Sequence, residues 1–543
     1  MQDVAPGTLL LDAARAAGAA LGAPCGGAGT CGKCRVRIVQ GLVGAPTADE
    51  RALLTEAELQ RGVRLACRCR VLGAATVEIE ETATVESDVL GAGVMGDFRR
   101  DRVPGDGRPA LGVAVDIGTT TVAVGLIDLR SGAELAAGTA LNPQTAFGHD
   151  VLSRVRYAVQ AEHRGELARV IRACVDRITG EACRDAAQRR DDIRRYVVAG
   201  NTAMTHLLLD LEVSGLGRAP YEPTAAAPPP RPAAALGWAA SEGAEVFCVP
   251  AVSAFVGGDI VAGLLATGLP DRERIGLLVD MGTNGEVVLG SRDGLWACSC
   301  AAGPAFEGMG ISCGMRAAPG AIDAARVVDG AVSPATIGGG QPLGLCGSGV
   351  IDVAAALLEA GVVEPSGRFA RAAEGRPWAA LLRDGPRRYV LSATGAREIS
   401  FSQGDVRQVQ LAKGAIASGI AALLGAAGID ARRVARLLIA GQFGHHVRRE
   451  SLVALGLVPY ELEDRGEVVG NTSKSGAVMC LLSRAQRARA ATVAGGVRHV
   501  ELSTLPRFER LLAEKMAFPS RGQAGAERHP RELVKRAPAP VRS

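Results

Sequence analysis

Residues 113–128, VAVDIGTTTVAVGLID, determine how most of this chain folds. Two apolar runs of strand length flank a short polar turn, so the segment predicts a buried β-hairpin. Gly118 allows the backbone to approach an anion closely, and Asp116 can hold a water molecule on a divalent cation. Three consecutive threonines add donors for a phosphate, although a purely structural turn would show the same pattern. These are Thr119, Thr120 and Thr121.

Residues 277–290, LLVDMGTNGEVVLG, repeat this pattern. Asp280 stands near the end of an apolar run, as Asp116 does, and a small polar turn again leads into a second apolar run. A tandem pair of such hairpins indicates two related lobes that face each other across a cleft. The second turn consists of Gly282, Thr283, Asn284 and Gly285.

Three other apolar runs end in a glycine that is followed by an amide side chain. A strand of this kind that opens a helix places backbone N–H groups at its carboxyl end, where ligands bind in open α/β sheets. The three pairs are Gly200 with Asn201, Gly441 with Gln442, and Gly470 with Asn471.

Further candidate residues lie between these strands. Glu307, in a glycine-rich loop after the second hairpin, can orient a water molecule or a metal ion. Gly347 and Ser348 open an Ala/Leu-rich helix whose glycines permit close packing against a lobe. Asp259, just inside a helix, is either part of the site or an ordinary N-terminal helix charge. The residues predicted to act in catalysis are Asp116, Asp280 and Glu307.

Near the N-terminus, a glycine-rich loop carries cysteines at gaps of five and two residues. Such a loop can wrap an iron–sulfur cluster while its N–H groups point at the sulfurs, and a distant fourth cysteine closes the cage. The competing interpretation is a zinc site, which usually uses two Cys-x-x-Cys pairs, and Cys67-Arg-Cys69 is not such a pair. Cys69 is the alternative to Cys67 as the fourth ligand. The predicted ligands are Cys25, Cys31, Cys34 and Cys67.

Composition limits the classes of function. The chain has 543 residues, 48% of them hydrophobic, which is enough for several large cores. Its formal charge of +4 comes from a basic C-terminal tail, so nothing points to a nucleic-acid surface. Thirteen cysteines without a secretory signal indicate reduced thiols and metal ligation. No apolar run approaches the roughly 20 residues of a membrane helix, so we expect a cytoplasmic protein that binds neither nucleic acid nor a membrane.

Periodicity and composition divide the chain into four parts. Residues 1–82 hold the cysteine loop. Residues 83–110 lose periodicity and gather Gly, Asp, Arg and Pro, so we expect a flexible linker there. Residues 111–515 contain both hairpins, and residues 516–543 are expected to form a disordered, basic tail.

The first part resembles the 2Fe–2S ferredoxins. Thr8-Leu-Leu-Leu-Asp-Ala-Ala is similar to the helix before their cluster loop, and Arg64-Leu-Ala-Cys67 to the segment that delivers the last ligand. The gap of five residues matches the adrenodoxin-like branch. The resemblance implies an α+β domain of the β-grasp type. Such ferredoxins begin with a further strand, so either the true start lies upstream or one edge of the small sheet is missing.

Residues 111–510 resemble the superfamily of acetate and sugar kinases, heat-shock chaperones and actin. The resemblance implies a two-lobed actin-like, RNase H-like domain that binds ATP with Mg²⁺, and hence a multidomain α/β chain. It places the two phosphate loops at residues 116–121 and 280–285. It places Gly441, Gln442, Gly470 and Asn471 on the adenosine side.

A ferredoxin fused ahead of such a module resembles the reductive activators of corrinoid proteins. The resemblance implies one-electron transfer from the 2Fe–2S cluster to an inactive Co(II) corrinoid on a separate protein, coupled to ATP hydrolysis. The product, Co(I), serves a corrinoid-dependent methyltransferase or demethylase system. The sequence has no flavin or nicotinamide motif, so an external low-potential electron donor is implied. Whether the chain forms a homodimer is left open.

Three alternatives use the same features. A metabolite kinase would use the same cleft but needs no tethered ferredoxin. An activator of a dehydratase shares the nucleotide fold but holds a 4Fe–4S cluster between subunits. A nucleotide-switched redox docking protein would lack catalytic turnover, and measurable ATPase activity stimulated by a corrinoid partner would exclude it.

Overall fold

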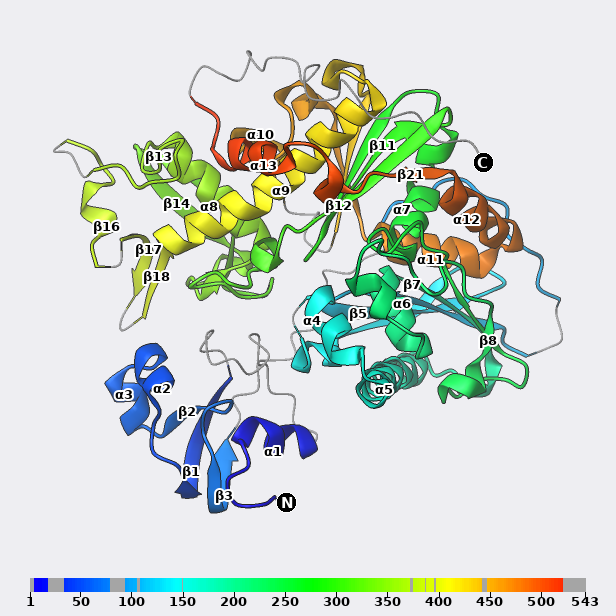
Figure 1. Cartoon of the computed structure of the whole chain (residues 1–543), viewed down its shortest axis with the longest axis horizontal. Helices are drawn as coiled ribbons and strands as arrows, with labels where there is room; N and C mark the ends of the chain where they lie inside the picture. Colours follow the sequence, from blue (N-terminus) through cyan, green and yellow to red (C-terminus); the bar gives the residue numbers. More distant parts are fainter. Residues whose placement is uncertain are drawn as a thin grey trace.

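The computed structural model describes residues 4–17, 34–78, 93–104, 108–148, 150–371, 375–385, 387–394, 397–441 and 447–520. These residues form a small N-terminal unit and two larger lobes, each built on a mixed sheet (Figure 1). This arrangement agrees with the predicted multidomain α/β fold.

The N-terminal unit is a small α+β domain. Its three-stranded sheet has the order β2-β1-β3, and β1 runs antiparallel to both neighbours. Capping boxes start two short helices. The side chains of Thr47 and Thr55 accept hydrogen bonds from the backbone N–H groups of Glu50 and Glu58, and the carboxylates of these glutamates accept from the N–H groups of the two threonines. The elements are α1 (Leu10–Ala16), β1 (Arg35–Val43), α2 (Ala48–Leu53), α3 (Glu56–Gln60), β2 (Val63–Leu65) and β3 (Val71–Glu78).

The first lobe contains a six-stranded sheet in the order β6-β5-β4-β7-β9-β8. The first predicted hairpin forms its centre, because β4 pairs antiparallel with β5. On the other side β7 runs parallel to β4, which brings the carboxyl ends of both strands to one edge. The elements are β4 (Leu111–Ile117), β5 (Thr121–Asp128), β6 (Glu134–Leu141), α4 (Val151–Ala158), α5 (Ala161–Asp185), β7 (Ile193–Gly200), α6 (Thr202–Leu209), β8 (Arg231–Pro232), β9 (Glu245–Cys248) and α7 (Gly258–Thr267).

The second lobe repeats this order as β12-β11-β10-β19-β20, with β21 added beyond β12. The second predicted hairpin, β10 with β11, takes the place of β4 with β5, and β19 takes the place of β7. The prediction of two related lobes is therefore confirmed. The main elements are β10 (Gly276–Met281), β11 (Gly285–Ser291), β12 (Gly294–Cys300), α9 (Gln403–Ala427), β19 (Arg436–Ala440), α10 (Arg449–Ala454), β20 (Gly466–Gly470), α11 (Thr472–Leu482), α12 (Arg484–Gly496), β21 (Val497–His499) and α13 (Phe508–Met516).

Two small sheets are inserted into the second lobe, in the orders β14-β13-β15 and β16-β17-β18. One helix of this lobe, α9, is long and apolar enough to cross a membrane by length and composition alone. However, 72% of its most apolar window is buried, and it packs against β11 and β12. Burial in the lobe accounts for its composition. The inserted elements are β13 (Ala321–Val328), β14 (Ala331–Thr336), β15 (Gly344–Leu345), α8 (Gly347–Glu359), β16 (Leu382–Arg383), β17 (Arg388–Thr394) and β18 (Arg397–Ser402).

Two helices join the lobes. α7 leads from the first lobe to the second, and α11 follows β20 and packs back against β4 and β7. They cross so closely that a Cβ on Gly476 would lie 2.0 Å from the carbonyl oxygen of Ala262. One buried apolar cluster, here called the joint core, contains residues of both helices and of both sheets, such as Val197 and Leu278. Figure 1 shows α7 and α11 between the two sheets.

Residues 93–104, the described part of the predicted linker, lie along this joint, and we call them the strap. Three of its backbone N–H groups donate to carbonyl oxygens of β20, α7 and α11. Phe98 and Val103 pack against the joint core. The strap is therefore bound to the two lobes, although a flexible linker was expected over residues 83–110. Residues 79–92 lie outside the described residues, and flexibility there stays a prediction.

Candidate functional site

The turn of the first hairpin is fixed by hydrogen bonds to its own backbone. The N–H of Gly118 donates to the carbonyl oxygen of Thr121 at 2.9 Å, and the buried amide of Asn142 donates to that of Gly118 at 2.8 Å. Asn201, at the start of α6, donates to the hydroxyl of Thr119 at 3.1 Å. A Cβ at position 118 would lie 2.8 Å from the oxygen of Thr121, so a larger residue would force the turn to shift. These contacts hold the turn in one conformation.

A buried arginine beneath this turn was missed by sequence reasoning. The guanidinium of Arg154, on α4, donates to the carbonyl oxygens of Thr119 at 2.5 Å and of Gly148 at 2.8 Å. Burial lowers the pKa of Arg154 to about 9, which leaves it charged at neutral pH. A positive charge under an anion-binding turn favours a phosphate. In the sequence it is one of several arginines near an amphipathic helix, and nothing distinguishes it.

Glu307 connects the two predicted phosphate loops. The hydroxyls of Thr120, in the first lobe, and Thr283, in the second, donate to its two carboxylate oxygens at 2.7 and 2.8 Å. The two hydroxyl oxygens lie 3.1 Å apart. Glu307 ends the 3-10 turn Pro304–Glu307, and burial raises its pKa. A carboxylate with a raised pKa between two phosphate loops is suited to accept a proton there.

The second loop is closed in the same manner as the first. The N–H of Gly282 donates to the carbonyl oxygen of Asn284 at 3.1 Å. Gly285 begins β11 beside α9, where a Cβ would lie 2.7 Å from the side chain of Ile416. This glycine allows the helix to approach the loop.

Two other predicted segments support these loops from behind. Gly200 ends β7, where a Cβ would lie 2.9 Å from the carbonyl oxygen of Ile117 at the end of β4. Gly347 and Ser348 begin α8, which packs against the turn that carries Glu307. Ser348 is buried, so the described contacts give it a packing role beside the site.

Asp116 is held by residues from the opposite end of the chain. Its carboxylate accepts hydrogen bonds from the amide of Asn471 at 2.8 Å and the hydroxyl of Ser473 at 2.7 Å. Burial raises the pKa of Asp116, and these two bonds oppose the rise. Lys474, one residue further on, is buried and forms an ion pair with Glu134 of β6 at 2.6 Å. The start of α11 therefore attaches to the first lobe at this carboxylate.

Two more carboxyl groups, Asp280 and Asp259, interact with Asp116, and Glu286 interacts with those two. Burial and then the charge of Asp116 raise the pKa of Asp280 to about 7. Burial, followed by the charges of Asp280 and Asp116, raises the pKa of Asp259 to about 7. Burial, and then the negative charges of Asp259 and Asp280, raise the pKa of Glu286 well above its ordinary value. Asp259 therefore lies close enough to Asp116 and Asp280 to interact with their charges, and Glu286 was missed because it reads as an ordinary strand position.

These carboxylates have the chemistry of a magnesium site without forming a closed cage. Within the described ranges, no three His, Cys, Asp or Glu side chains are arranged to hold a metal ion by themselves. Mg²⁺ usually keeps several waters and is held by one or two carboxylates together with phosphates. Asp116 and Asp280 fit this pattern because each is the first residue of a predicted phosphate loop.

The residues expected on the adenosine side are only partly described, because Gln442 lies outside the described residues. Gly441 has φ +119°, and a Cβ there would lie 2.4 Å from a carbonyl oxygen of β10. Gly470 has φ +68° and precedes α11. The side chain of Asn471, expected near adenosine, instead reaches Asp116 beside the first phosphate loop.

In the N-terminal domain, two of the four predicted cluster ligands are described. Cys34 and Cys67 are buried, and their segments are adjacent because the N–H of Ala66 donates to the carbonyl oxygen of Cys34 at 2.8 Å. Cys69, the alternative fourth ligand, is buried as well, so burial does not distinguish it from Cys67. Two buried thiols on adjacent segments fit the donor set of a 2Fe–2S cluster. The other two predicted ligands, Cys25 and Cys31, lie outside the described residues.

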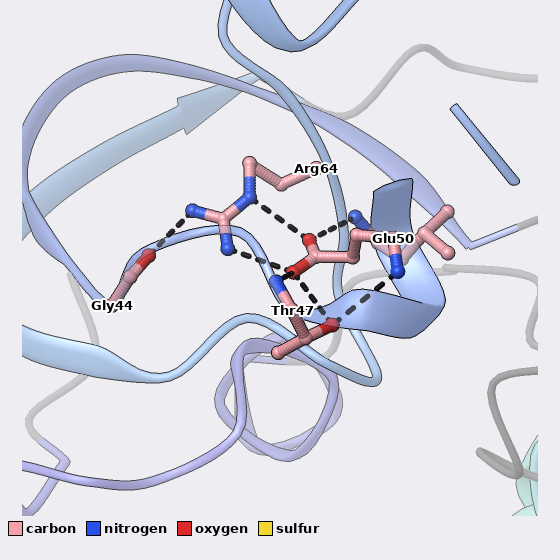
Figure 2. Close-up of polar contacts among 5 residues, drawn as sticks. Gly44, Thr47, Glu50 and Arg64 are labelled. Carbon is pink, nitrogen blue, oxygen red and sulfur yellow. Dashed lines mark hydrogen bonds and ion pairs between the residues drawn. The ribbon is translucent and has the colours of Figure 1, made fainter. Parts of the chain in front are cut away.

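A buried ion pair fixes the segment that carries Cys67 (Figure 2). The carboxylate of Glu50, on α2, accepts two hydrogen bonds from the guanidinium of Arg64, both at 2.9 Å. The same carboxylate accepts from the N–H groups of Thr47 at 2.8 Å and Leu65 at 3.0 Å. Glu50 therefore ties α2 to β2, two residues before the predicted ligand.

Together these features define a class: a ferredoxin-like domain joined to a two-lobed nucleotide-binding domain with the actin-like fold. Family models match the chain in that order. The 2Fe-2S iron-sulfur cluster binding domain matches residues 1–72, and the RACo middle region matches residues 111–272. The C-terminal domain of RACo, described as the ASKHA domain, matches residues 274–528.

Individual relatives agree with these matches. The corrinoid activation enzyme RamQ of Eubacterium limosum is 34% identical over 418 residues, which are 74% of this chain and 69% of RamQ. The [Co(II) methylated amine-specific corrinoid protein] reductase of Methanosarcina barkeri is 29% identical over 239 residues, and the match spans only 40% of its length. The solved structure of a reductive activator for corrinoid, iron-sulfur protein superposes with a TM-score of 0.71 at 30% identity, over 95% of this chain and 96% of that one. The chain belongs to the family of reductive activators of corrinoid proteins, which confirms the expected fold, 2Fe–2S cluster and ATP binding.

Proposed function

We propose that this chain couples ATP hydrolysis to the transfer of one electron from its 2Fe–2S cluster to the Co(II) corrinoid of a separate protein. This restores Co(I) in a methyltransferase or demethylase system. The observation that carries the proposal is that one polypeptide joins the buried thiols Cys34 and Cys67 to two phosphate loops that meet at Glu307. The names of the relatives, which refer to corrinoid activation and reduction, support it.

ATP is required because the electron transfer is unfavourable by itself. For scale, a 2Fe–2S cluster of the plant type has a potential of about −400 mV, and a Co(II) corrinoid is harder to reduce. Each unfavourable ~59 mV of a one-electron step costs about 1.4 kcal/mol. Closing two lobes on ATP supplies a change at the acceptor, for instance by favouring a partner conformation in which cobalt loses an axial ligand.

The site residues have distinct roles in this proposal. The backbone and hydroxyls of the two threonine turns hold the terminal phosphates, and Arg154 adds positive charge beneath the first turn. Asp116 and Asp280 would hold Mg²⁺ beside these phosphates. Glu307 orients the attacking water and accepts its proton. The 2Fe–2S cluster, when bound, takes up and passes on one electron.

The partners follow from the same chemistry. The corrinoid protein receives the electron, and an external low-potential donor resupplies the cluster. A homodimer and a cytoplasmic location stay predictions. Light scattering of the purified holoprotein, alone and with a corrinoid protein, would decide the assembly.

Anaerobic reduction of candidate corrinoid proteins tests the proposal. We expect the Co(I) spectrum to develop with ATP, and to develop more slowly or not at all without nucleotide or with a non-hydrolysable analogue. Equal yields under all three conditions would reject the coupling. Cys67→Ser should lose the visible absorption of the cluster and all corrinoid reduction, whereas the matched variant Cys69→Ser should keep both. The reverse result would make Cys69 the fourth ligand.

Magnesium is expected to stabilise the protein more at pH 8 than at pH 6. The pKa of Asp280 in the folded protein is about 7, above its ordinary value of 3.8. At pH values between these two, Asp280 therefore takes up a proton when the protein folds. Its stability without metal therefore falls as pH rises through 7, and Mg²⁺ offsets the repulsion by stabilising the ionised carboxylates. Thermal denaturation with and without Mg²⁺ measures this. Asp280→Asn should flatten the pH dependence, and an unchanged Mg²⁺ effect in this variant would place the ion elsewhere.

A further inference from the structure

We propose that the strap is a positioning element through which the nucleotide site controls the ferredoxin domain, with Gly93 as its contact to that site. The inference rests on the proposed ATP-coupled function and names the route of the coupling. The strap runs beside α12 in Figure 1 and leads, through residues outside the described ranges, to the ferredoxin domain.

The N-terminal end of the strap contacts a residue of the nucleotide site. A Cβ on Gly93 would lie 2.6 Å from the carbonyl oxygen of Val469 and 2.8 Å from that of Asn471. The N–H of the next residue, Val94, donates to the same oxygen of Val469 at 3.0 Å. The side chain of Asn471 in turn donates to Asp116 at 2.8 Å. One residue therefore separates the strap from the carboxylate that begins the first phosphate loop.

The strap is also attached to both joint helices. The N–H of Gly96 donates to the carbonyl oxygen of Ala266, on α7, at 2.8 Å. The N–H of Asp101 donates to that of Leu482, at the end of α11, at 2.9 Å. These two helices join the lobes, so a rotation of one lobe against the other displaces at least one of these acceptors.

At its far end the strap binds the first lobe. The guanidinium of Arg100 donates to the carbonyl oxygen of Ser131, in the turn between β5 and β6, and Arg130 of this turn donates to that of Pro104 at 3.3 Å. Val469, by contrast, belongs to the second lobe. Because the two ends hold different lobes, the strap must shift or release a contact when the lobes close.

Charge reinforces the attachment at Asp101. Its carboxylate accepts from the N–H of Arg484 at 3.0 Å. It also faces Arg195, on β7, and Arg487, on α12; burial lowers the pKa of both, and the charge of Asp101 opposes this. If Asp101 were removed, its carboxylate would no longer offset the positive charges of Arg195, Arg484 and Arg487. The strap therefore neutralises a basic surface as well as bonding to the joint.

Hydrogen exchange of the full-length holoprotein tests the inference without a corrinoid partner. The amides of Val94, Gly96 and Asp101 should exchange at rates that differ by about 5- to 150-fold between the protein with Mg²⁺ and a non-hydrolysable ATP analogue and the protein with ADP. Exchange that is identical in both nucleotide states would overturn the proposal, even if ATP stimulates corrinoid reduction. Absence of that stimulation in the unaltered protein would instead refute the proposed function.

Two glycine variants separate coupling from simple packing. Gly93→Ala forces its Cβ against two backbone oxygens, whereas at Gly96 the nearest atom to a new Cβ is 3.4 Å away, an ordinary contact. Gly93→Ala should keep the cluster potential, and should lose at least about tenfold in the corrinoid reduction obtained per ATP hydrolysed. Gly96→Ala should match the unaltered protein. If Gly93→Ala does not fold, Asp101→Ala should speed exchange of the strap amides and lower the same ratio; an unchanged ratio in either folded variant would reject the role.

Discussion

Exchanging Glu307 for glutamine is expected to slow ATP hydrolysis by about 10²- to 10⁴-fold and to leave ATP binding nearly unchanged. The glutamine side chain still contacts the hydroxyls of Thr120 and Thr283, so the loops keep their positions. It cannot accept a proton from water. The carboxylate of Glu307, whose pKa is raised by burial, can do so. Steady-state hydrolysis and calorimetric ATP binding, measured on the same preparation, separate the two effects.

Thr283→Ser is the matched control for this experiment. Serine keeps the hydroxyl that donates to Glu307 and loses only a methyl group, so hydrolysis should stay close to that of the unaltered protein. If Glu307→Gln hydrolyses ATP at the original rate, the carboxylate only joins the two lobes. If the variant no longer binds ATP, the main role of Glu307 is to arrange the loops for the phosphates, and another group must activate water.

The parts of the site that carry a local signal could be predicted from the sequence. A buried hairpin shows two apolar runs around a small turn, and this pattern located Asp116 and Asp280 and the turns that follow them. The repetition of the pattern indicated two lobes. Glu307 was found because a carboxylate in a glycine-rich loop is unusual, and its hydrogen bonds to both lobes agree with the expected cleft.

The contacts between distant segments could not be predicted. Asn471 reaches Asp116 across 355 residues of sequence, and no local pattern encodes that distance. Arg154 becomes part of the site only because α4 packs beneath the first turn. The strap shows neither helical nor strand periodicity, since it is held by backbone hydrogen bonds to its neighbours, and low periodicity is also what a free linker shows.

Removing the carboxylate of Glu50 should destabilise the ferredoxin domain by about 3–5 kcal/mol and release the cluster at room temperature. Glu50 is fully buried and Arg64 is 5% exposed, so Glu50→Ala leaves a buried guanidinium without its counter-ion. The change also removes the acceptor of the N–H of Leu65, two residues before Cys67. Visible absorption of the cluster during urea denaturation, compared with far-ultraviolet circular dichroism, measures both losses.

An exposed ion pair in the same domain provides the control. Arg37 and Glu78 pair at the surface with side chains 51% exposed, so Glu78→Ala should cost no more than about 1 kcal/mol. Burial alone would raise the pKa of Glu50, but hydrogen bonds from Arg64, Thr47 and Leu65 lower it overall. Its contribution is therefore present above the ordinary value of 4.5 and is lost as pH falls through the lower folded pKa. Equal losses of stability in the two alanine variants would contradict the role of Glu50, because burial is the property that distinguishes the two pairs.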